Sequence, residues 1–333
     1  MTGARFGDLA LALQTRRDLS ALKTDAARLT GELASGRRAD PARAASGDLG
    51  PLSSLARSLT LIEAHAGVVA EAAQTAAAMQ SVLERVQGIG AALAPALLAA
   101  GSAGGVGFAA AAGTQARAAL DDALGALNTR AGGRSVMAGA ATDGAAVSDG
   151  ATLLAAASAA AAGQTTAAGV VQAVNDWFDD PAGFAALGYL GAATGTAFPV
   201  APGRTVTLDV TAADPAVSGV LKGLVSAALL AEGALPGDAV GQGELALAAG
   251  TALISADAGL AGLRGRVGTA EARIEAGATT IAAERTALGI RRAEMLAADD
   301  FDTATALQQV EQRLELLFTV TARLSRLNLS DFL

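Results

Sequence analysis

The chain has 333 residues, a formal net charge of −8 at pH 7 and no cysteine. The acidic balance argues against nucleic-acid binding, because neutralising phosphates needs clustered Lys and Arg, and the lack of cysteine excludes disulfides and thiolate metal sites. Aromatic residues are only 3% of the chain, and small residues dominate. Small side chains give each helix little buried area, which favours long helices with extended contacts over a compact globule.

The first expected helix covers about residues 5 to 34 and stops at Ser35-Gly36, where a polar stretch begins. Its apolar residues recur at alternating spacings of three and four, which is typical of a helix edge that must meet another helix. These seam residues are Leu19, Leu22, Ala26, Leu29 and Leu33. We expect the edge to form an assembly interface.

A second helix is expected from Pro51. Its seam includes Leu55, Ile62, Val69, Ala73 and Ala76 and continues in a shifted register through Met79, Val82 and Val86. The uncharged stretch between Arg85 and Arg117 is long enough on paper for a membrane span. Pro95 and the glycines from 101 to 107 interrupt it, and Ala is too weakly apolar to drive insertion firmly. We therefore expect a bend between this helix and a third one, at about 108 to 130.

Between about 140 and 243 Gly, Thr, Pro and Asp become frequent. Residues 205–211 alternate polar and apolar and predict a half-buried strand. Asp214-Pro215 predicts an N-cap followed by proline in the first turn of a helix that reaches Leu230. This region is predicted to be a small mixed α+β insertion.

Two long helices complete the chain, one spanning about 245 to 297 and one starting near Thr303, after the acidic cluster Asp299 to Asp302. The last helix again alternates spacings of three and four, and its seam residues are Leu307, Val310, Leu314, Leu317, Thr321 and Leu324. Residues 1–45 carry eight basic and five acidic side chains, whereas 294–333 carry three basic and seven acidic. Ends of opposite sign favour pairing of the two terminal helices, although exposed ion pairs add little strength.

The predicted fold is mainly α: a long antiparallel helical hairpin, or coiled-coil rod, formed by the N- and C-terminal segments, with a small inserted α+β domain. Three domains are expected. They are the terminal coiled-coil helices (1–45 with 295–333), a helical rod (46–140 with 245–294) and the variable insertion (141–244).

We expect no catalytic, cofactor-binding or metal site. His65 is the chain's only histidine and has no cysteine to pair with, so a packing or surface role is favoured. Residues 105–110 fit a loose dinucleotide-binding pattern, but they follow a helix-like segment instead of a strand. Asp299, Asp300 and Asp302 lack the spacing of a calcium loop and are better interpreted as helix-capping residues.

Three stretches resemble the bacterial flagellin superfamily. Residues 27–37, with the sequence ARLTGELASGR, resemble the "RLSSGLR"-like end of the N-terminal helix in that superfamily. Residues 127–143 resemble an "LN…GR.LF.G..TD" stretch, and residues 319–333 resemble the C-terminal ending of hook-associated proteins of the hook–filament junction more than that of filament flagellin.

The resemblance implies a structural protein: an adaptor ring between hook and filament, with terminal helices packed into concentric tubes and the insertion outside. It implies self-assembly, contact with a neighbouring hook-associated protein and flagellin, an export chaperone, and type III export to an extracellular location without a cleavable signal. Two alternatives remain open, namely filament flagellin itself and a membrane-active type III translocator that uses residues 86–116.

Overall fold

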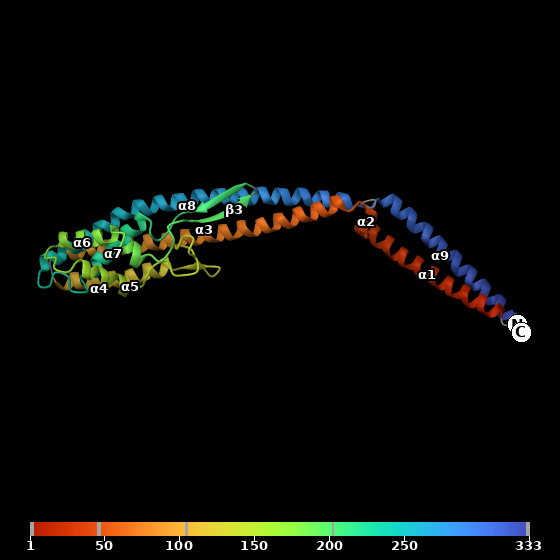
Figure 1. Ribbon diagram of the computed structural model, residues 1–333, viewed down its shortest axis with the longest axis horizontal. Coiled ribbons are helices and arrows are strands. Elements are labelled where there is room, and N and C mark those ends of the chain that lie inside the picture. Colours follow the sequence, from red (N-terminus) through yellow and green to blue (C-terminus); the bar gives the residue numbers. More distant parts are fainter. Residues whose placement is uncertain (1–2, 45–47, 104–105, 202, 331–333) are drawn as a thin grey trace. The chain divides into compact units, whose positions relative to one another are not determined.

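The computed structural model describes residues 3–44, 48–103, 106–201 and 203–330, and it is mainly helical with two small antiparallel hairpins (Figure 1). In chain order the elements are α1 (Gly3–Ser35), α2 (Pro41–Ala44), α3 (Gly50–Ala103), α4 (Val106–Leu127), β1 (Arg130–Ala131), β2 (Arg134–Ser135), α5 (Gly150–Ala160), α6 (Ala167–Asp179), the π-helix η1 (Phe184–Gly188), β3 (Thr196–Ala201), β4 (Arg204–Leu208), α7 (Pro215–Ala228), α8 (Ala239–Leu296) and α9 (Asp300–Ser330). The predicted class, mainly α with a small α+β insertion, is confirmed.

The chain divides into two compact units, and the long helices α3 and α8 contribute to both. The terminal unit contains residues 1–63 and 282–333, and the central unit contains residues 64–281. The three predicted domains have other boundaries than these two units, and the division into three domains stays a prediction.

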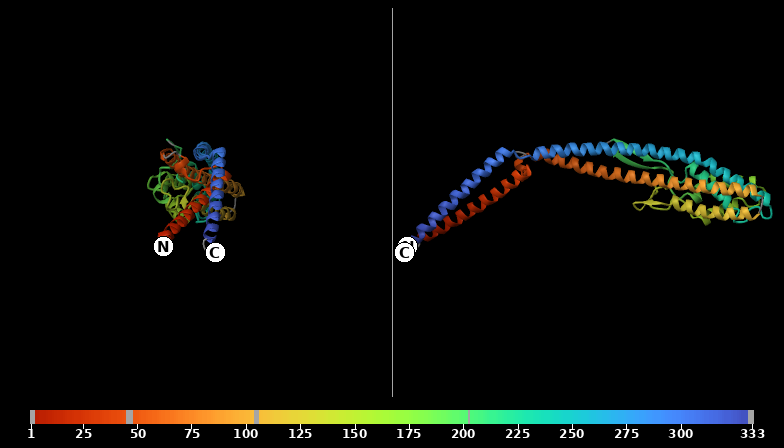
Figure 2. Two further views of the ribbon diagram at one scale, coloured as in Figure 1. Left: turned by 90° about the vertical axis from the view of Figure 1, so that its right-hand side faces the viewer. Right: turned by 180° about the vertical axis from the view of Figure 1, so that it is seen from behind.

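In the terminal unit, α1 and α9 lie side by side and run antiparallel, so that the start of α1 and the end of α9 lie at the same end of the pair (Figures 1 and 2). At the other end, Gly36 adopts φ +63° and stops α1. The amide of Arg38 then donates to the carbonyl of Leu296 at 2.9 Å, and the amide of Ala298 donates to the carbonyl of Gly36 at 3.0 Å. These backbone bonds join the segment after α1 to the segment before α9.

The start of α9 differs from the prediction. The helix begins at Asp300, not near Thr303, because Asp299 caps it: its Oδ1 accepts a hydrogen bond from the amide of Asp302 at 2.9 Å. The acidic cluster is thus the beginning of the helix and not a break before it.

In the central unit, α3 and α8 pack against each other. Gln80 Nε2 donates to the carbonyl of Arg264 at 2.9 Å, and Gln87 Nε2 donates to Asp257 Oδ1 at 2.7 Å. Near the end of α3, a Cβ on Gly101 would lie 2.3 Å from Leu247 Cγ, so only glycine permits this approach. The pairing is held by side chains from helices that are far apart in sequence.

Two details of the second predicted helix were wrong. Pro95 does not interrupt α3, because the carbonyl that it leaves unpaired belongs to Ala91, on an exposed face where water can reach it. One predicted seam residue, Ala73, is exposed, and its neighbour Ala72 is buried instead, whereas Leu55, Ile62, Val69 and Ala76 are buried at strict heptad spacing. The order of the three- and four-residue spacings is therefore reversed at this one turn of the helix.

The predicted bend falls at residues that lie outside the described part of the chain. α3 ends at Ala103, α4 begins at Val106, and residues 104–105 lie outside the described part of the chain. Gly101 and Gly107 are inside helices. α4 ends at Leu127, earlier than predicted, because a tight hairpin of β1 and β2 follows, with Gly132 and Gly133 at positive φ in its turn.

The predicted strand is shorter than expected. β4 ends at Leu208, which pairs with Thr196 at the start of β3, so the residues beyond it have no strand to pair with.

Asp214 occupies the N-cap position of α7, with Pro215 next, as predicted. However, its side chain makes no capping bond, and its Oδ2 instead accepts from Arg266 Nη2 at 2.6 Å.

Candidate assembly surface

The structure places most seam residues of α1 and α9 between full burial and full exposure. Leu29 is buried, whereas Leu33 and Thr321 are exposed. Half-buried positions are Leu19, Leu22, Ala26, Leu307, Val310, Leu314 and Leu317. The side chain of Leu324 lies outside the described residues. Pairing of α1 with α9 therefore leaves much of both seams partly accessible.

A second apolar group lies on α9 outside the predicted seam. Leu316 is 65% exposed and Val320 is 51% exposed, and a spacing of four puts them on one helix face. Phe318, two residues from each, points to another side of α9, where its ring faces Lys23 of α1. Phe301, in the first turn, is 80% exposed. We call Leu316 and Val320 the outer stripe. The alternating spacing of three and four predicts a single seam, which contains Leu317 and not its neighbour Leu316, so it does not indicate this second group.

Large exposed apolar side chains concentrate in the terminal unit. Among the described residues, nine of the fourteen large hydrophobic side chains that are exposed belong to it, although it holds roughly a third of the chain. They are Leu13, Leu33, Leu49, Leu61, Ile290, Phe301, Leu316, Phe318 and Val320. Clustered exposed apolar surface marks an interaction site more often than scattered single residues do.

Polar contacts support the pairing of α1 with α9 without covering the outer stripe. The Lys23 ammonium lies 5.7 Å from the centre of the Phe318 ring, a cation–π contact between the two helices. Arg28 bonds to Asp25 at 3.1 Å and to Glu32 at 3.0 Å on α1 itself.

Glu32 links α1 to the segment that follows it. Glu32 is only 6% exposed, and its carboxyl group accepts from the amide of Ala39 at 3.0 Å and pairs with Arg28. Burial works to raise the pKa of this carboxyl, but the Ala39 hydrogen bond and the Arg28 guanidinium outweigh it, and the net pKa is lowered. The ionised form of Glu32 thus stabilises the end of α1.

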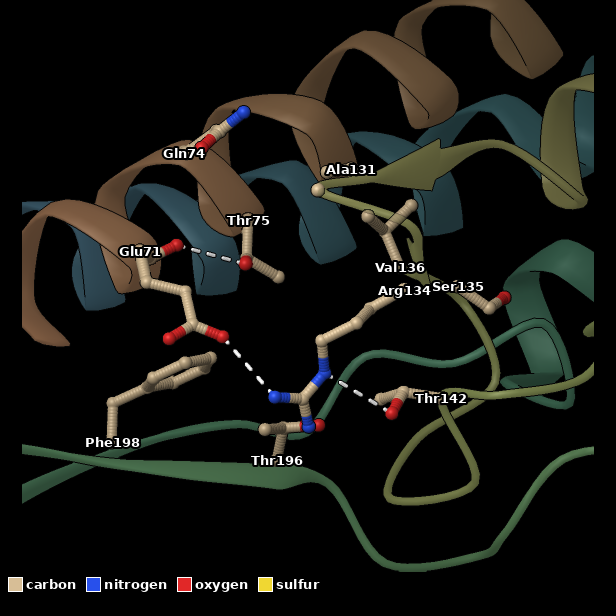
Figure 3. Close-up of a pocket in the computed structure, with 11 residues that line it drawn as sticks. Glu71, Gln74, Thr75, Ala131, Arg134, Ser135, Val136, Thr142, Thr196 and Phe198 are labelled. Atoms are coloured by element: carbon tan, nitrogen blue, oxygen red, sulfur yellow. Dashed lines mark hydrogen bonds and ion pairs between the residues drawn. The ribbon is translucent and has the colours of Figure 1, made fainter.

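A pocket of about 110 Å³ lies in the central unit, between α3, the β1–β2 hairpin and β3. Figure 3 shows the residues that line it. Arg134 crosses it, donating through Nη1 to Glu71 Oε1 at 3.2 Å and through Nε to Thr142 Oγ1 at 3.2 Å. The lining contains no histidine, and the Glu71 carboxylate is paired with Arg134. The arrangement ties the hairpin to α3 and offers no activated nucleophile.

The other residues considered for catalysis, cofactor binding or metal binding lie at separate positions. His65 is half-buried on α3. The loose dinucleotide pattern begins at Gly105, outside the described residues, and continues into α4. Within the described residues, no group of three His, Asp or Glu side chains could hold a metal ion.

Two helices, α3 and α8, are long and apolar enough to cross a membrane by length and composition, each with an 18-residue window of mean hydropathy 1.4. Their side chains also form the contacts between α3 and α8 described above. Core helices of non-membrane proteins pass the same test, so the finding carries little weight alone.

No protein-family model and no curated protein matches the sequence. Solved structures do match the fold. One is a protein from Vibrio parahaemolyticus that is provisionally described as a flagellar hook-associated protein, with 13% identity and a TM-score of 0.52. The match covers 73% of this chain and 95% of that one. At this identity the likeness concerns the fold.

Proposed function

We propose that the chain is a non-enzymatic structural subunit of the bacterial flagellum, a hook-associated protein that forms an adaptor ring at the hook–filament junction. The observation that carries the proposal is the terminal unit, where α1 and α9 expose more large apolar side chains than they bury among those that the structure describes. The fold shared with a protein described as hook-associated, and the three sequence stretches that resemble the flagellin superfamily, support the same assignment.

The assembly surface would have two layers. The seams of α1 and α9 hold the pair together while staying partly accessible, and the outer stripe of α9 faces a neighbouring subunit. Burying a large apolar side chain contributes about 1.5–3 kcal/mol, so repeated contacts along two helices of about 30 residues would provide substantial association energy. Neighbouring copies, another hook-associated protein and flagellin are the proposed partners, and an export chaperone would cover the same surface before type III export to the cell exterior.

Deletion of the gene tests the assignment. A junction adaptor is needed to hold the filament, so the deletion strain should lose motility and shed flagellin into the medium, and the intact gene in trans should restore both. Normal motility of the deletion strain, with attached filaments, would contradict the proposal.

Filament flagellin is the second candidate, because it would expose the same kind of terminal helices. Copy number separates the two. A junction protein should be a trace component of sheared flagella, whereas filament flagellin would be the major band on a gel.

A membrane-active translocator is the third candidate, and the apolar windows in α3 and α8 are the observation that favours it. Incubation of the chain with lipid vesicles and flotation in a density gradient distinguishes it. A structural adaptor should stay at the bottom of the gradient, whereas a translocator should float with the vesicles.

A further inference from the structure

An open groove of about 460 Å³ lies in the central unit, beside the end of α5 and along α6. The chain's only tryptophan, Trp177, lines it together with the carboxyl groups of Asp176 and Asp180 and the amides of Gln164 and Gln172. Its volume falls within the range typical of small-molecule sites.

The surroundings of the groove carry negative charge. No Lys, Arg or His occurs between Arg134 and Arg204, whereas this stretch contains five aspartates. The nearby basic residue on α7 is Lys222, and its ammonium pairs with both oxygens of Asp179, at 2.7 and 2.8 Å. In the part of the chain that the structure describes, Asp176 and Asp180 have no such ion pair.

The carboxyl groups of Asp176 and Asp180 accept hydrogen bonds from neighbouring groups that do not neutralise their charge. Asp176 Oδ1 accepts from Gln172 Nε2 at 2.7 Å, and Asp180 Oδ1 accepts from the amide of Ala182 at 2.8 Å. Both donors are neutral, so each carboxylate still attracts a cation.

Trp177 supplies an aromatic surface whose orientation is fixed. Its ring meets Phe178 edge-to-face with centroids 5.0 Å apart, and Phe184 at 6.4 Å. Tryptophan has the strongest attraction for cations among the aromatic residues, and the attraction increases when nearby groups exclude water. An indole and two carboxylates that line the same groove match an organic cation better than a neutral or anionic molecule.

We propose that this groove binds a small organic cation with an alkylammonium or quaternary ammonium group, held by the Trp177 ring and the carboxylates of Asp176 and Asp180. Contacts of this kind at an open site are individually weak, so we expect a dissociation constant on the order of 1 mM. The site belongs to the central unit, and binding does not require assembly.

The single tryptophan gives a direct readout, because tryptophan fluorescence of the full chain reports Trp177 alone. Choline chloride is added up to about 50 mM, with sodium chloride at the same ionic strength and glucose as reference titrations. We expect a saturable change with choline only. A folded chain that shows no saturable change, or that responds equally to glucose, would overturn the proposal.

Matched variants locate the response. The double variant D176N/D180N keeps the shape of the groove but removes its charge, and it should weaken choline binding about five- to tenfold. D122N makes the same chemical change at an exposed position on α4, outside the groove lining, and should change the affinity less than twofold. Circular dichroism confirms that each variant is folded. Equal affinities in the double variant and the unmodified chain would contradict the proposal.

Discussion

The two units of this chain bury their apolar side chains to very different extents. Of the 64 buried hydrophobic residues in the described chain, sixty lie in the central unit and four, Leu29, Leu55, Ile62 and Leu296, lie in the terminal unit. The central unit packs α4 and α7 together and covers the paired helices α3 and α8, so its helices have more than one neighbour. In the terminal unit α1 and α9 have mainly each other.

This difference indicates which unit buries its apolar side chains without a further partner. A helix with one partner buries one stripe, and any second apolar stripe stays in water. The outer stripe of α9 is such a surface. The central unit thus has the core of an independently stable domain, whereas the terminal unit has the composition of an interface that a further partner would complete.

The largest expected effect is on the core of the central unit. Leu221 is fully buried on α7. Its replacement by alanine should lower the free energy of unfolding by about 2–5 kcal/mol. Chemical denaturation followed by circular dichroism measures it, and L187A, at an exposed position on η1, should change stability by less than about 0.5 kcal/mol. Similar losses for both variants would remove the distinction between core and surface in this unit.

Truncation of the outer stripe should affect assembly and not the isolated chain. The double variant L316A/V320A loses side chains that contact solvent in the monomer, so the unfolding free energy should change by less than about 0.5 kcal/mol. Association should weaken roughly 10- to 100-fold, because both side chains lose their burial against a neighbour.

Co-assembly with purified flagellar components, followed by sedimentation, measures this loss. The control is I254A, which truncates a similarly exposed side chain on α8 in the central unit. If L316A/V320A assembles as well as I254A does, the outer stripe is not the interface.

A smaller effect concerns pH at the end of α1. The pKa of Glu32 lies below its ordinary value of 4.5, so its stabilisation is fully present above that pH and is lost as pH falls through the folded-state pKa. Amide exchange of residues 33–40 should therefore accelerate at low pH beyond the change expected from intrinsic exchange.

E32Q tests this directly. It should destabilise the segment by about 1 kcal/mol near neutral pH and remove most of the additional low-pH effect. E311Q, which changes an exposed carboxyl group on α9, should preserve the pH dependence of the unmodified chain. An unchanged pH profile in E32Q would show that another group is responsible.

Much of this architecture could be predicted from the order of residues. The seams on α1, α3 and α9 follow from apolar spacing, which is local information, and so does the start of α7 at Pro215. Where prediction failed, the cause was an interaction invisible in local sequence: a solvent-facing carbonyl that permits Pro95, the partner strand that limits β4, and Arg266, which takes the Asp214 side chain.

The candidate surface was predictable only in part. The alternating spacing identified the edges along which α1 meets α9, but not which apolar residues remain uncovered after they pair. Leu316 and Val320 are adjacent to seam residues in sequence, and only the three-dimensional pairing shows that they lie outside it. The Trp177 groove likewise depends on how α5 and α6 meet.

Limited proteolysis of the purified chain and of assembled flagella, read by mass spectrometry, tests the central claim most directly. In the isolated chain, cleavage should begin within residues 3–44 and 300–330 while residues 64–281 resist, and in the assembly the terminal segments should become protected. Equal resistance of α1 and α9 in both states would show that the terminal helices need no neighbour, which contradicts the account.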